Sequence, residues 1–329
     1  MTTRTRNTLP RITRGHGLPE KVRIYEVGPR DGLQSEAARV PTAVKAEFIR
    51  RLAGAGLTVI EATSFVSPRW IPQLDDAHEV LAAVGALGGI RLPVLVPNDR
   101  GLDRALAAGA QEIAVVASAT ESFSKNNLGR SVDGALAMLE PVIHRARAAN
   151  LPVRGYVSMC FGDPWEGEVH PRQAATVAYR LVDMGCTSLS LGDTIGVATP
   201  GHVLELLEAI HAFDIAGERI ALHFHDTYGQ ALANVHAALT AGITEFDSSA
   251  GGIGGCPYAR GATGNLATED LLWMLTGLGI DTGVDLSALA AISRWMAEHL
   301  GRPSPSRVVT ALANRAPATT DRAVPVDGD

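Results

Sequence analysis

The stretch Ile220-Ala221-Leu222-His223-Phe224-His225-Asp226-Thr227 decides how the rest of the chain can be interpreted. It begins as an apolar run of the strand type, in which successive side chains point to opposite faces. His223 and His225 therefore share one face, while Leu222 and Phe224 share the other. Two imidazoles on one face form half of a metal site, although a surface strand with two solvated histidines has the same short pattern.

Similar apolar, β-branched runs recur along the chain and alternate with amphipathic stretches of helical period. Several helical stretches end in a glycine just before the next strand, as at Gly56, Gly109 and Gly242, which is a common way to end a helix. Eight such strand–helix units without a linker predict a single-domain α/β protein with a (β/α)8 TIM-barrel fold. We expect strands at residues 22–27, 57–61, 92–96, 112–116, 153–157, 187–191, 220–224 and 243–247.

The composition of the two terminal segments differs from that of the strand–helix units. The first twenty residues carry four arginines and no acid before Glu20, which resembles a transit peptide, but a solvated tail is favoured because Pro10 lies among them and no apolar helical face is present. The last residues are rich in Pro, Ala, Thr and Arg. We therefore predict a flexible tail at 1–20, the barrel at 21–302 and a second flexible tail at 303–329.

Composition restricts the partners of this chain. A hydrophobic content of 46% with 19% charged residues is enough for a large core, and no apolar run approaches the roughly 20 residues that a membrane span needs. A net charge of -6 without a basic stripe argues against nucleic acid and anionic membranes, which favours small-molecule chemistry. Three unevenly spaced cysteines, Cys160, Cys186 and Cys256, indicate a reducing compartment, and we expect the cytoplasm.

Polar residues gather where five of the predicted strands end. In a TIM barrel the carboxyl ends of the strands surround the active site, so these side chains are expected to converge on one cavity. Simpler explanations exist: Arg30 and Asp31 as a surface ion pair, Glu61 as a neutralising partner of Arg30, Asp193 as a helix cap, and Cys256 as a small buried residue in a tight turn. The residues at strand ends are Arg30, Asp31, Glu61, Asp193, His223, His225 and Cys256.

Asp31, His223 and His225 together offer one carboxylate and two imidazoles to a metal ion. This donor set suits Mg²⁺ or Mn²⁺, with Zn²⁺ less favoured, and the lack of a cysteine pair argues against a structural zinc site. A carboxamide oxygen can complete the shell. Asn234 and Asn265 both follow the histidines, and either can instead be an ordinary turn or capping residue.

Five motifs make the chain recognisable. They closely resemble the family of 3-hydroxy-3-methylglutaryl-CoA (HMG-CoA) lyase, a metal-dependent branch of the barrel superfamily that also contains isopropylmalate synthase. The resemblance extends from about Val22 to about Leu300. The Arg-Asp and His-x-His motifs are shared across the superfamily, whereas the Gly-Gly-Cys-Pro-Tyr loop is more particular to the lyases. The motifs are EVGPRDGLQ (26–34), TSFVSP (63–68), LGDTIG (191–196), HFHDTYGQALAN (223–234) and GGCPYA (254–259).

This resemblance implies roles for individual residues. It makes Asp31, His223, His225 and Asn265 the metal ligands. It makes Arg30 the group that stabilises an enolate, Glu61 a second acidic partner and Cys256 the catalytic thiol. The base is either Asp31 or His223. Substrate contacts are expected from Arg30, Gln34, Ser64, Tyr156, Asp193 and Thr194.

One position departs from the family pattern. Lyases of this group commonly carry a lysine three residues after the glutamine of the first loop, where this chain has Ala37, with Arg39 two residues further on. The residues that would contact the outer part of coenzyme A are therefore not assigned. Lys125 and Arg130 are candidates to pair with its phosphates, and solvated surface charge is the simpler explanation.

The function implied by the resemblance is cleavage of HMG-CoA to acetyl-CoA and acetoacetate, as in leucine breakdown. Three alternatives remain: a lyase for a longer 3-alkyl-3-hydroxyglutaryl-CoA, a condensing enzyme of the isopropylmalate synthase type, and a metal-binding scaffold without activity. No residue after Leu300 suggests the regulatory domain that many such synthases carry. We expect an acyl-CoA as the small-molecule partner and a homodimer or larger homo-oligomer.

Overall fold

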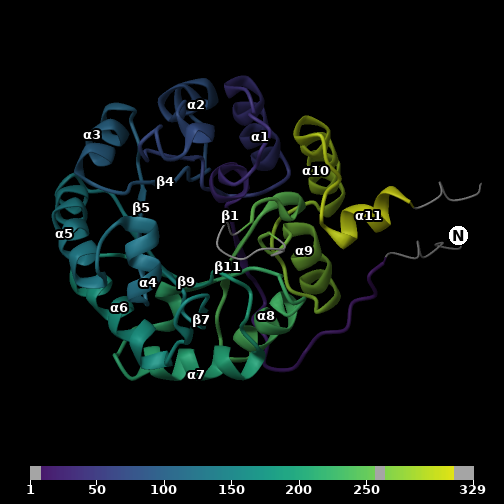
Figure 1. Cartoon of the computed structure of the whole chain (residues 1–329). Coiled ribbons are helices and arrows are strands. Elements are labelled where there is room, and N and C mark those ends of the chain that lie inside the picture. The colour runs from purple at the N-terminus through teal and green to yellow at the C-terminus, as the bar shows by residue number, and fades with distance from the viewer. Residues whose placement is uncertain (1–8, 256–263, 315–329) are drawn as a thin grey trace, which may run out of the picture.

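A curled sheet of parallel strands forms the centre of the protein, and helices surround it (Figure 1). The computed structural model describes residues 9–255 and 264–314. The strands follow one another around the sheet in the order β2-β1-β11-β10-β9-β6-β5-β4-β3. Their bounds are β1 (Arg23–Glu26), β2 (Val59–Ile60), β3 (Thr63–Ser64), β4 (Val94–Leu95), β5 (Ile113–Ser118), β6 (Val153–Ser158), β9 (Ser188–Asp193), β10 (Ile220–Phe224) and β11 (Glu245–Ser248).

The two ends of this sheet, β2 and β3, belong to one stretch of chain that is interrupted at Glu61. The N–H of Glu61 donates to the carbonyl of Glu26 at 2.8 Å, on the β1 side. The N–H of Ile60 donates to Arg91 O at 3.0 Å and that of Ala62 to Pro93 O at 2.9 Å, on the β4 side. The second strand therefore pairs on both sides and closes the ring. The predicted α/β fold, an eight-stranded TIM barrel, is confirmed, and each predicted strand is present.

Each barrel strand is followed by a helix, because an amphipathic stretch follows each apolar run in the sequence. These helices are α1 (Thr42–Gly54), α2 (Ala77–Val84), α3 (Asp99–Ala107), α5 (Val132–Ala148), α6 (Pro171–Asp183), α7 (Pro200–His211), α8 (Ala231–Thr240) and α9 (Thr268–Gly277). The additional elements are α4 (Glu121–Phe123), α10 (Leu286–Leu300), α11 (Arg307–Ala313) and a small hairpin of β7 (Gly162–Asp163) and β8 (Gly167–Glu168). Short helical turns lie at η1 (Gly28–Gly32), η2 (Pro72–Leu74), η3 (Ser124–Leu128), η4 (Gly217–Arg219) and η5 (Ala250–Gly252).

The hydrophobic core lies between the sheet and the helices, where alternate strand residues such as Leu222, Phe224 and Phe246 are fully buried. The interior of the barrel is different, because it holds charge. Arg154 of β6 is 1% exposed and its guanidinium lies 3.7 Å from the ring centroid of Tyr25. It donates to Glu245 and to Asp247, both at 2.5 Å. A buried cation is tolerated only with such partners.

The predicted loose tail from residue 303 onward is wrong for residues 303–314, because helix α11 lies there. Ser306 begins this helix: its hydroxyl accepts a hydrogen bond from the N–H of Val309 and donates to Asp270 of α9 at 2.6 Å. The described part of the N-terminal tail also contacts the barrel, since Thr13 N–H donates to Gly277 O at 2.8 Å.

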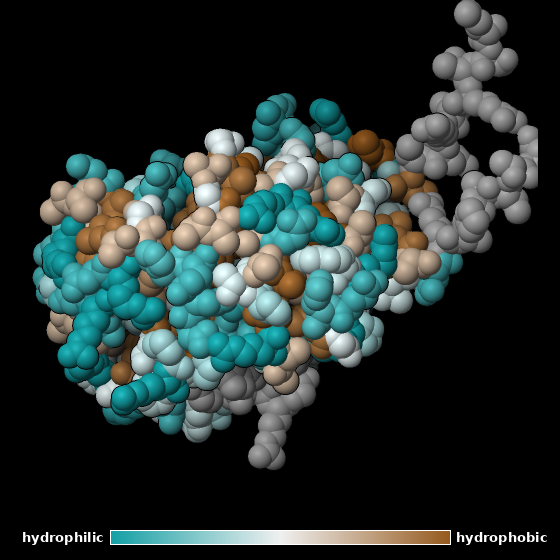
Figure 2. Space-filling view, turned by 90° about the horizontal axis from the view of Figure 1, so that it is seen from above, coloured by the Kyte–Doolittle hydropathy of each residue, from teal (hydrophilic) through white to brown (hydrophobic). Residues whose placement is uncertain are grey.

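The surface shows polar and apolar residues side by side (Figure 2). None of the helices within residues 9–255 and 264–314 is both long and apolar enough to cross a membrane.

Candidate active site

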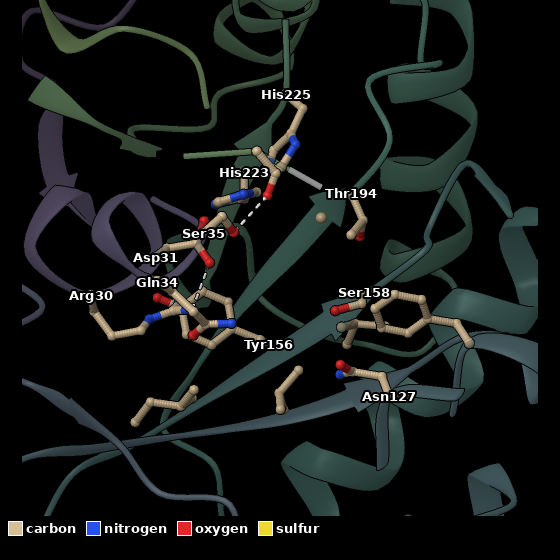
Figure 3. Close-up of a pocket in the computed structure, with 16 residues that line it drawn as sticks. Arg30, Asp31, Gln34, Ser35, Asn127, Tyr156, Ser158, Thr194, His223 and His225 are labelled. Atoms are coloured by element: carbon tan, nitrogen blue, oxygen red, sulfur yellow. Dashed lines mark hydrogen bonds and ion pairs between the residues drawn. The ribbon is translucent and has the colours of Figure 1, made fainter. Parts of the chain in front are cut away.

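A cavity with about 840 Å³ of empty space, part of it open to solvent, lies at the carboxyl ends of the strands. Chain segments that are far apart in the sequence meet in it, because parallel strands deliver their following loops to the same end of a barrel. One wall carries the apolar side chains Leu95, Val116 and Phe123. The polar residues that line the cavity are Arg30, Asp31, Gln34, Ser35, Asn127, Tyr156, Ser158, Thr194, His223 and His225 (Figure 3).

Asp31, His223 and His225 form a compact cluster. Each offers one ligand atom, and these three atoms lie within 4.8 Å of one another. Asp31 comes from the turn η1 that follows β1, whereas the histidines come from β10 and the residue just after it. Since β11 alone separates β1 from β10 in the sheet, the closed barrel brings these groups to one point.

Asn265 lies at the same cluster. Its side-chain nitrogen donates to Asp31 Oδ2 at 3.0 Å and to Ile253 O at 3.2 Å. Asn234, the alternative from the sequence, instead donates from the middle of α8 to Ala198 O at 3.0 Å. The cluster therefore includes Asn265, and the structure gives Asn234 a structural role.

Two features of the cluster fit a divalent metal ion. Oδ1 of Asn265 and Nδ1 of His225 are buried and have no hydrogen-bond partner among the described residues. An unpaired buried acceptor is costly, and coordination of a cation removes that cost. One carboxylate, two imidazoles and one carboxamide oxygen form a mixed nitrogen and oxygen donor set, which suits ions such as Mg²⁺ or Mn²⁺.

The electrostatic environment gives the two histidines different pKa values. Burial, together with the neighbouring His223, lowers the pKa of His225 to about 4. Burial also acts to lower the pKa of His223, but the hydrogen bond and charge of Asp247 outweigh it, so that this pKa is raised. The pKa of Asp31 is about 2: burial opposes its ionisation, and Arg30 and the histidines overcome that effect. Asp31 is therefore a carboxylate at neutral pH.

Sequence reasoning missed the partner of His223. Oδ2 of Asp247 lies 3.3 Å from Nδ1 of His223 and also accepts a hydrogen bond from Ser190 at 2.8 Å. The other carboxylate oxygen accepts from Arg154. A signal was present, because Glu245 and Asp247 alternate within a predicted barrel strand and therefore share a face. Charged residues on an inward face require partners inside the barrel.

Arg30 lies beside the metal cluster and is held from two sides. Its Nε donates to Glu61 Oε2 at 2.8 Å and its Nη1 to Asp31 Oδ1 at 2.7 Å. Arg30 is 7% exposed and the Asp31 side chain 23%, so the two do not form the surface pair that was the simpler explanation. Glu61 does neutralise Arg30, and it also accepts from the hydroxyl of Tyr156 at 3.1 Å. Burial raises the pKa of Glu61 even though Arg30 opposes that rise.

The remaining predicted substrate contacts divide into two groups. Gln34, Tyr156 and Thr194 line the cavity. Asp193 does not line it: its carboxylate accepts hydrogen bonds from the N–H groups of Val197 and Ala198, both at 2.9 Å. This is the capping role that the sequence left open.

Ser64 is also absent from the cavity wall among the described residues. Its hydroxyl accepts from the N–H of Val66 at 3.2 Å, within its own turn. The structure therefore gives Asp193 and Ser64 backbone contacts, and the substrate contacts expected of them stay predictions. In both cases a short polar side chain satisfies a backbone N–H nearby, which is a common use of Asp and Ser in turns.

The structure describes two of the three cysteines, and both are buried. Cys160 and Cys186 are buried, and burial raises the pKa of each thiol to about 12. They are thus unsuited to thiol chemistry near neutral pH. Cys256, the predicted catalytic thiol, lies outside the described residues, and its role stays a prediction.

Lys125 does not line the cavity. It lies 3.4 Å from Glu121 with 64% of its side chain exposed, as a solvated surface charge does. The cavity instead includes Asn127 from the same loop, together with Ser35 and Ser158, which the sequence analysis missed. Ser158 had a signal, because it continues the alternation of Arg154 and Tyr156 along one strand.

The sequence is similar to known proteins over most of its length. A profile of the HMGL-like family matches residues 21–296. Hydroxymethylglutaryl-CoA lyase, mitochondrial, of Arabidopsis thaliana is 52% identical over 93% of this chain, which spans 65% of that protein. The cytoplasmic 3-hydroxy-3-methylglutaryl-CoA lyase of Rattus norvegicus is 51% identical over 90% of this chain and 86% of its own length.

Solved structures give the same result. The crystal structure of hydroxymethylglutaryl-CoA lyase from Pseudomonas aeruginosa superimposes with a TM-score of 0.89 at 48% identity, covering 91% of this chain and 100% of that one. An HMG-CoA lyase from Acinetobacter baumannii, solved with coenzyme A and 3-methylmalate, has a TM-score of 0.85 at 36% identity, covering 93% and 98%. The barrel, the cluster at its mouth and these matches place the chain in the HMGL-like family of carbon-carbon lyases.

Proposed function

We propose that this protein cleaves HMG-CoA to acetyl-CoA and acetoacetate. The observation that carries the proposal is the position of Arg30, which lies between Glu61 and Asp31 and next to the cluster of Asp31, His223 and His225. This arrangement puts a fixed cation beside a site for a divalent ion. The relatives with about half of their residues identical carry the name of this lyase.

The reaction makes three demands. The hydroxyl on C3 must lose its proton, the electrons of the bond between C2 and C3 must pass to the thioester as an enolate, and C2 must then gain a proton. C3 becomes the ketone of acetoacetate, and the protonated fragment is acetyl-CoA. Groups that stabilise the enolate more than the substrate lower the barrier.

Arg30 meets the second demand. Two of its nitrogens are occupied by Glu61 and Asp31, while Nη2 donates to no described residue. That nitrogen is available to donate to the thioester oxygen as negative charge develops on it. Because the guanidinium is already held, little reorganisation is required at the moment of reaction, and one such donor contributes on the order of 3 kcal/mol.

A divalent ion held by Asp31, His223, His225 and Asn265 would supply Lewis acidity and favour ionisation of a bound hydroxyl. Mg²⁺ or Mn²⁺ suits this donor set. Asp31 and His223 are the two basic groups of the cluster that are candidates to accept the proton. Leu95, Val116 and Phe123 line the same cavity, and these apolar side chains would exclude water from one side of a bound substrate.

The apolar side of the cavity also has space for a second, larger substrate. The wall carries no charged side chain, and the cavity is open at its outer side, so a longer alkyl branch on C3 has space there. We therefore propose that 3-alkyl-3-hydroxyglutaryl thioesters with a longer branch are also cleaved, at a lower rate. Leucine breakdown supplies the shorter substrate and is the pathway we propose for the protein.

Assays of the purified protein with Mn²⁺ or Mg²⁺ test the proposal. HMG-CoA should give equal amounts of acetoacetate and acetyl-CoA, and chelation should stop the reaction. Acetyl-CoA with 2-oxoisovalerate should release no coenzyme A. Steady release of coenzyme A from that pair, with no cleavage of HMG-CoA, would instead identify a condensing synthase.

Two further proposals concern the compartment and the assembly of the protein. The relatives are named both mitochondrial and cytoplasmic. We propose the cytoplasm, because the odd number of cysteines and two buried free thiols fit a reducing environment. We also propose a homo-oligomer, and light scattering of the purified chain would contradict this if it gave the mass of one 34.6 kDa chain.

A further inference from the structure

The segment Gly251–Gly255, which follows β11 and leads to the metal cluster, is held by residues from three other parts of the chain. Glu269 of α9 accepts a hydrogen bond from the N–H of Gly251 at 2.8 Å. Ser304, beyond α10, donates to the carbonyl of the same glycine at 2.8 Å. Ser35, in the loop after β1, donates to Gly255 O at 3.1 Å. The segment therefore depends on contacts from outside the barrel strands.

Glu36 adds a further contact, and Arg302 holds Glu36. The carboxylate of Glu36 accepts from the N–H of Gly254 at 3.3 Å. Arg302 Nε donates to Glu36 Oε2 at 3.0 Å, and its Nη2 donates to Oε1. The pair is bidentate, and the Glu36 side chain is 8% exposed. A planar guanidinium that binds both carboxylate oxygens fixes their orientation as well as their charge.

Gly254 lies against the residues of the metal cluster. Its φ is +108°, and a Cβ placed on it would lie 2.7 Å from Asn265 Nδ2 and 3.1 Å from the Cα of Gly32. Asn265 in turn donates to Asp31. Because no free space remains between them, a displacement of Gly254 displaces Asn265 or the turn that carries Asp31.

We propose that Arg302 is a positioning residue for the cleavage reaction, which acts through Glu36 and Gly254 on the placement of Asn265 and Asp31. The inference rests on the proposed function. It gives a role in the active site to a residue beyond the last barrel helix, at the point where the sequence predicts the end of the barrel. Arg302 itself is a positioning residue and touches no reacting atom.

The chain contains a matched control. Arg91 and Glu112 form another bidentate pair, with Nε to Oε2 at 2.8 Å and Nη2 to Oε1 at 2.5 Å. Their side chains are 44% and 6% exposed, close to the 37% and 8% of Arg302 and Glu36. Arg91 precedes β4 and therefore lies at the amino end of the barrel, away from the cavity.

The first experiment compares Arg302→Met, Arg302→Lys and Arg91→Met in the full chain. Arg302→Met should lower kcat by about ten- to a hundredfold with KM for HMG-CoA nearly unchanged, since small misplacements of catalytic groups have effects of this size. Arg302→Lys should recover part of the loss. Arg91→Met should keep kcat within about twofold, because its pair does not contact the site.

Two outcomes would overturn the proposal. A rise in KM with unchanged kcat for Arg302→Met would mean that Arg302 binds the substrate directly. An equal loss of kcat in Arg91→Met would mean that any loss of a bidentate pair destabilises the enzyme.

The second experiment needs no activity. Hydrogen exchange of the amides at 251–255 should become at least about tenfold faster in Arg302→Met and stay unchanged in Arg91→Met, because only the first removes the support of Glu36. If exchange responds in this way in a protein that does not cleave HMG-CoA, the positioning stands and the proposed function fails. If the protein cleaves HMG-CoA and exchange does not respond, the positioning is overturned.

Discussion

The carboxylate of Asp247 lies 3.3 Å from Nδ1 of His223. A carboxylate at this distance favours a proton on Nδ1, which makes Nε2 the basic nitrogen for the metal cluster. A carboxylate behind a ligating imidazole fixes both the tautomer and the orientation of the ring, and such partners commonly affect metal affinity by about ten- to a hundredfold.

Asp247→Asn should therefore weaken the binding of Mn²⁺ by about tenfold or more. Isothermal titration calorimetry of the purified variant measures this without reference to activity. Glu245→Gln is the control, because Glu245 shares Arg154 with Asp247 but does not contact His223. A similar loss of affinity in the control would attribute the effect to Arg154 and not to the imidazole.

Metal binding should release protons near neutral pH. The raised pKa of His223 means that this imidazole carries a proton at a pH where free histidine has begun to lose it, and the metal must displace that proton. His225, with a pKa of about 4, has no proton to lose there. The affinity for Mn²⁺ should rise from pH 6 to pH 8, and calorimetry in buffers of different ionisation enthalpy should detect the released proton. An affinity independent of pH in this range would contradict the prediction.

Glu269 should make the protein less stable as the pH rises. Burial raises its pKa from 4.5 to about 8 in the folded state. Between these values the folded state holds a proton that the unfolded state has lost, so the stabilising contribution is full below pH 4.5 and disappears as the pH passes 8. Each unit of pH in this window changes the free energy of unfolding by up to about 1.4 kcal/mol.

Glu269→Gln should flatten this dependence, because glutamine resembles the protonated acid, with one oxygen to accept from the N–H of Gly251 and an amide nitrogen in place of the acid O–H, and does not ionise. Urea denaturation between pH 5 and pH 8.5, with chelator present, compares the two proteins. Glu26, whose pKa burial raises to about 7, should keep a smaller slope of the same sign in the variant. An unchanged slope in Glu269→Gln would show that Glu269 titrates normally.

Arg30→Lys should reduce kcat by about a hundredfold or more. An ammonium group cannot bind Glu61 and Asp31 and still present a donor in the same plane, because it is a single point charge on a flexible stem. It does keep a positive charge beside the buried carboxylate of Glu61, so the fold should survive. Steady-state kinetics and thermal denaturation together test this. Retention of full kcat would remove Arg30 from the mechanism.

The cysteines should differ in reactivity. Cys160 and Cys186 are buried with a pKa of about 12, so iodoacetamide at pH 7.5 should leave both unmodified in the folded protein. Cys160→Ser and Cys186→Ser should keep most of the turnover. Cys256→Ser should lose several orders of magnitude, because its hydroxyl does not ionise near neutral pH. Mass spectrometry of alkylated peptides, together with kinetics, checks both parts, and equal losses in all three variants would indicate packing roles.

The fold could be predicted because its signals are periodic. Each barrel strand is an apolar, β-branched run, and the alternation within Ile220–Phe224 placed His223 on the inward face. The meeting of Asp31 with the histidines followed from the barrel itself, which brings all strand ends to one side. The site was therefore predictable wherever a side chain is placed by a strand.

The sequence was less informative where a loop conformation determines the contacts of a side chain. Asp193 and Ser64 bind backbone N–H groups of their own turns, and loop conformation, which has no periodic signal, determines such contacts. Ser304 was assigned to a tail because its neighbours are rich in proline and small residues, and Arg302 was taken only as the last residue of the barrel. Composition does not reveal that these two side chains contact Glu36 and Gly251.

The charges inside the barrel affect how the chain acquires its fold. Arg154 emerges from the ribosome about ninety residues before Glu245 and Asp247, the two acids that neutralise it. A nascent chain that ends after β6 would have to enclose an unpaired guanidinium if it collapsed into a half-barrel, and this is strongly unfavourable. Partial products of synthesis should therefore stay open until β11 is available to neutralise Arg154.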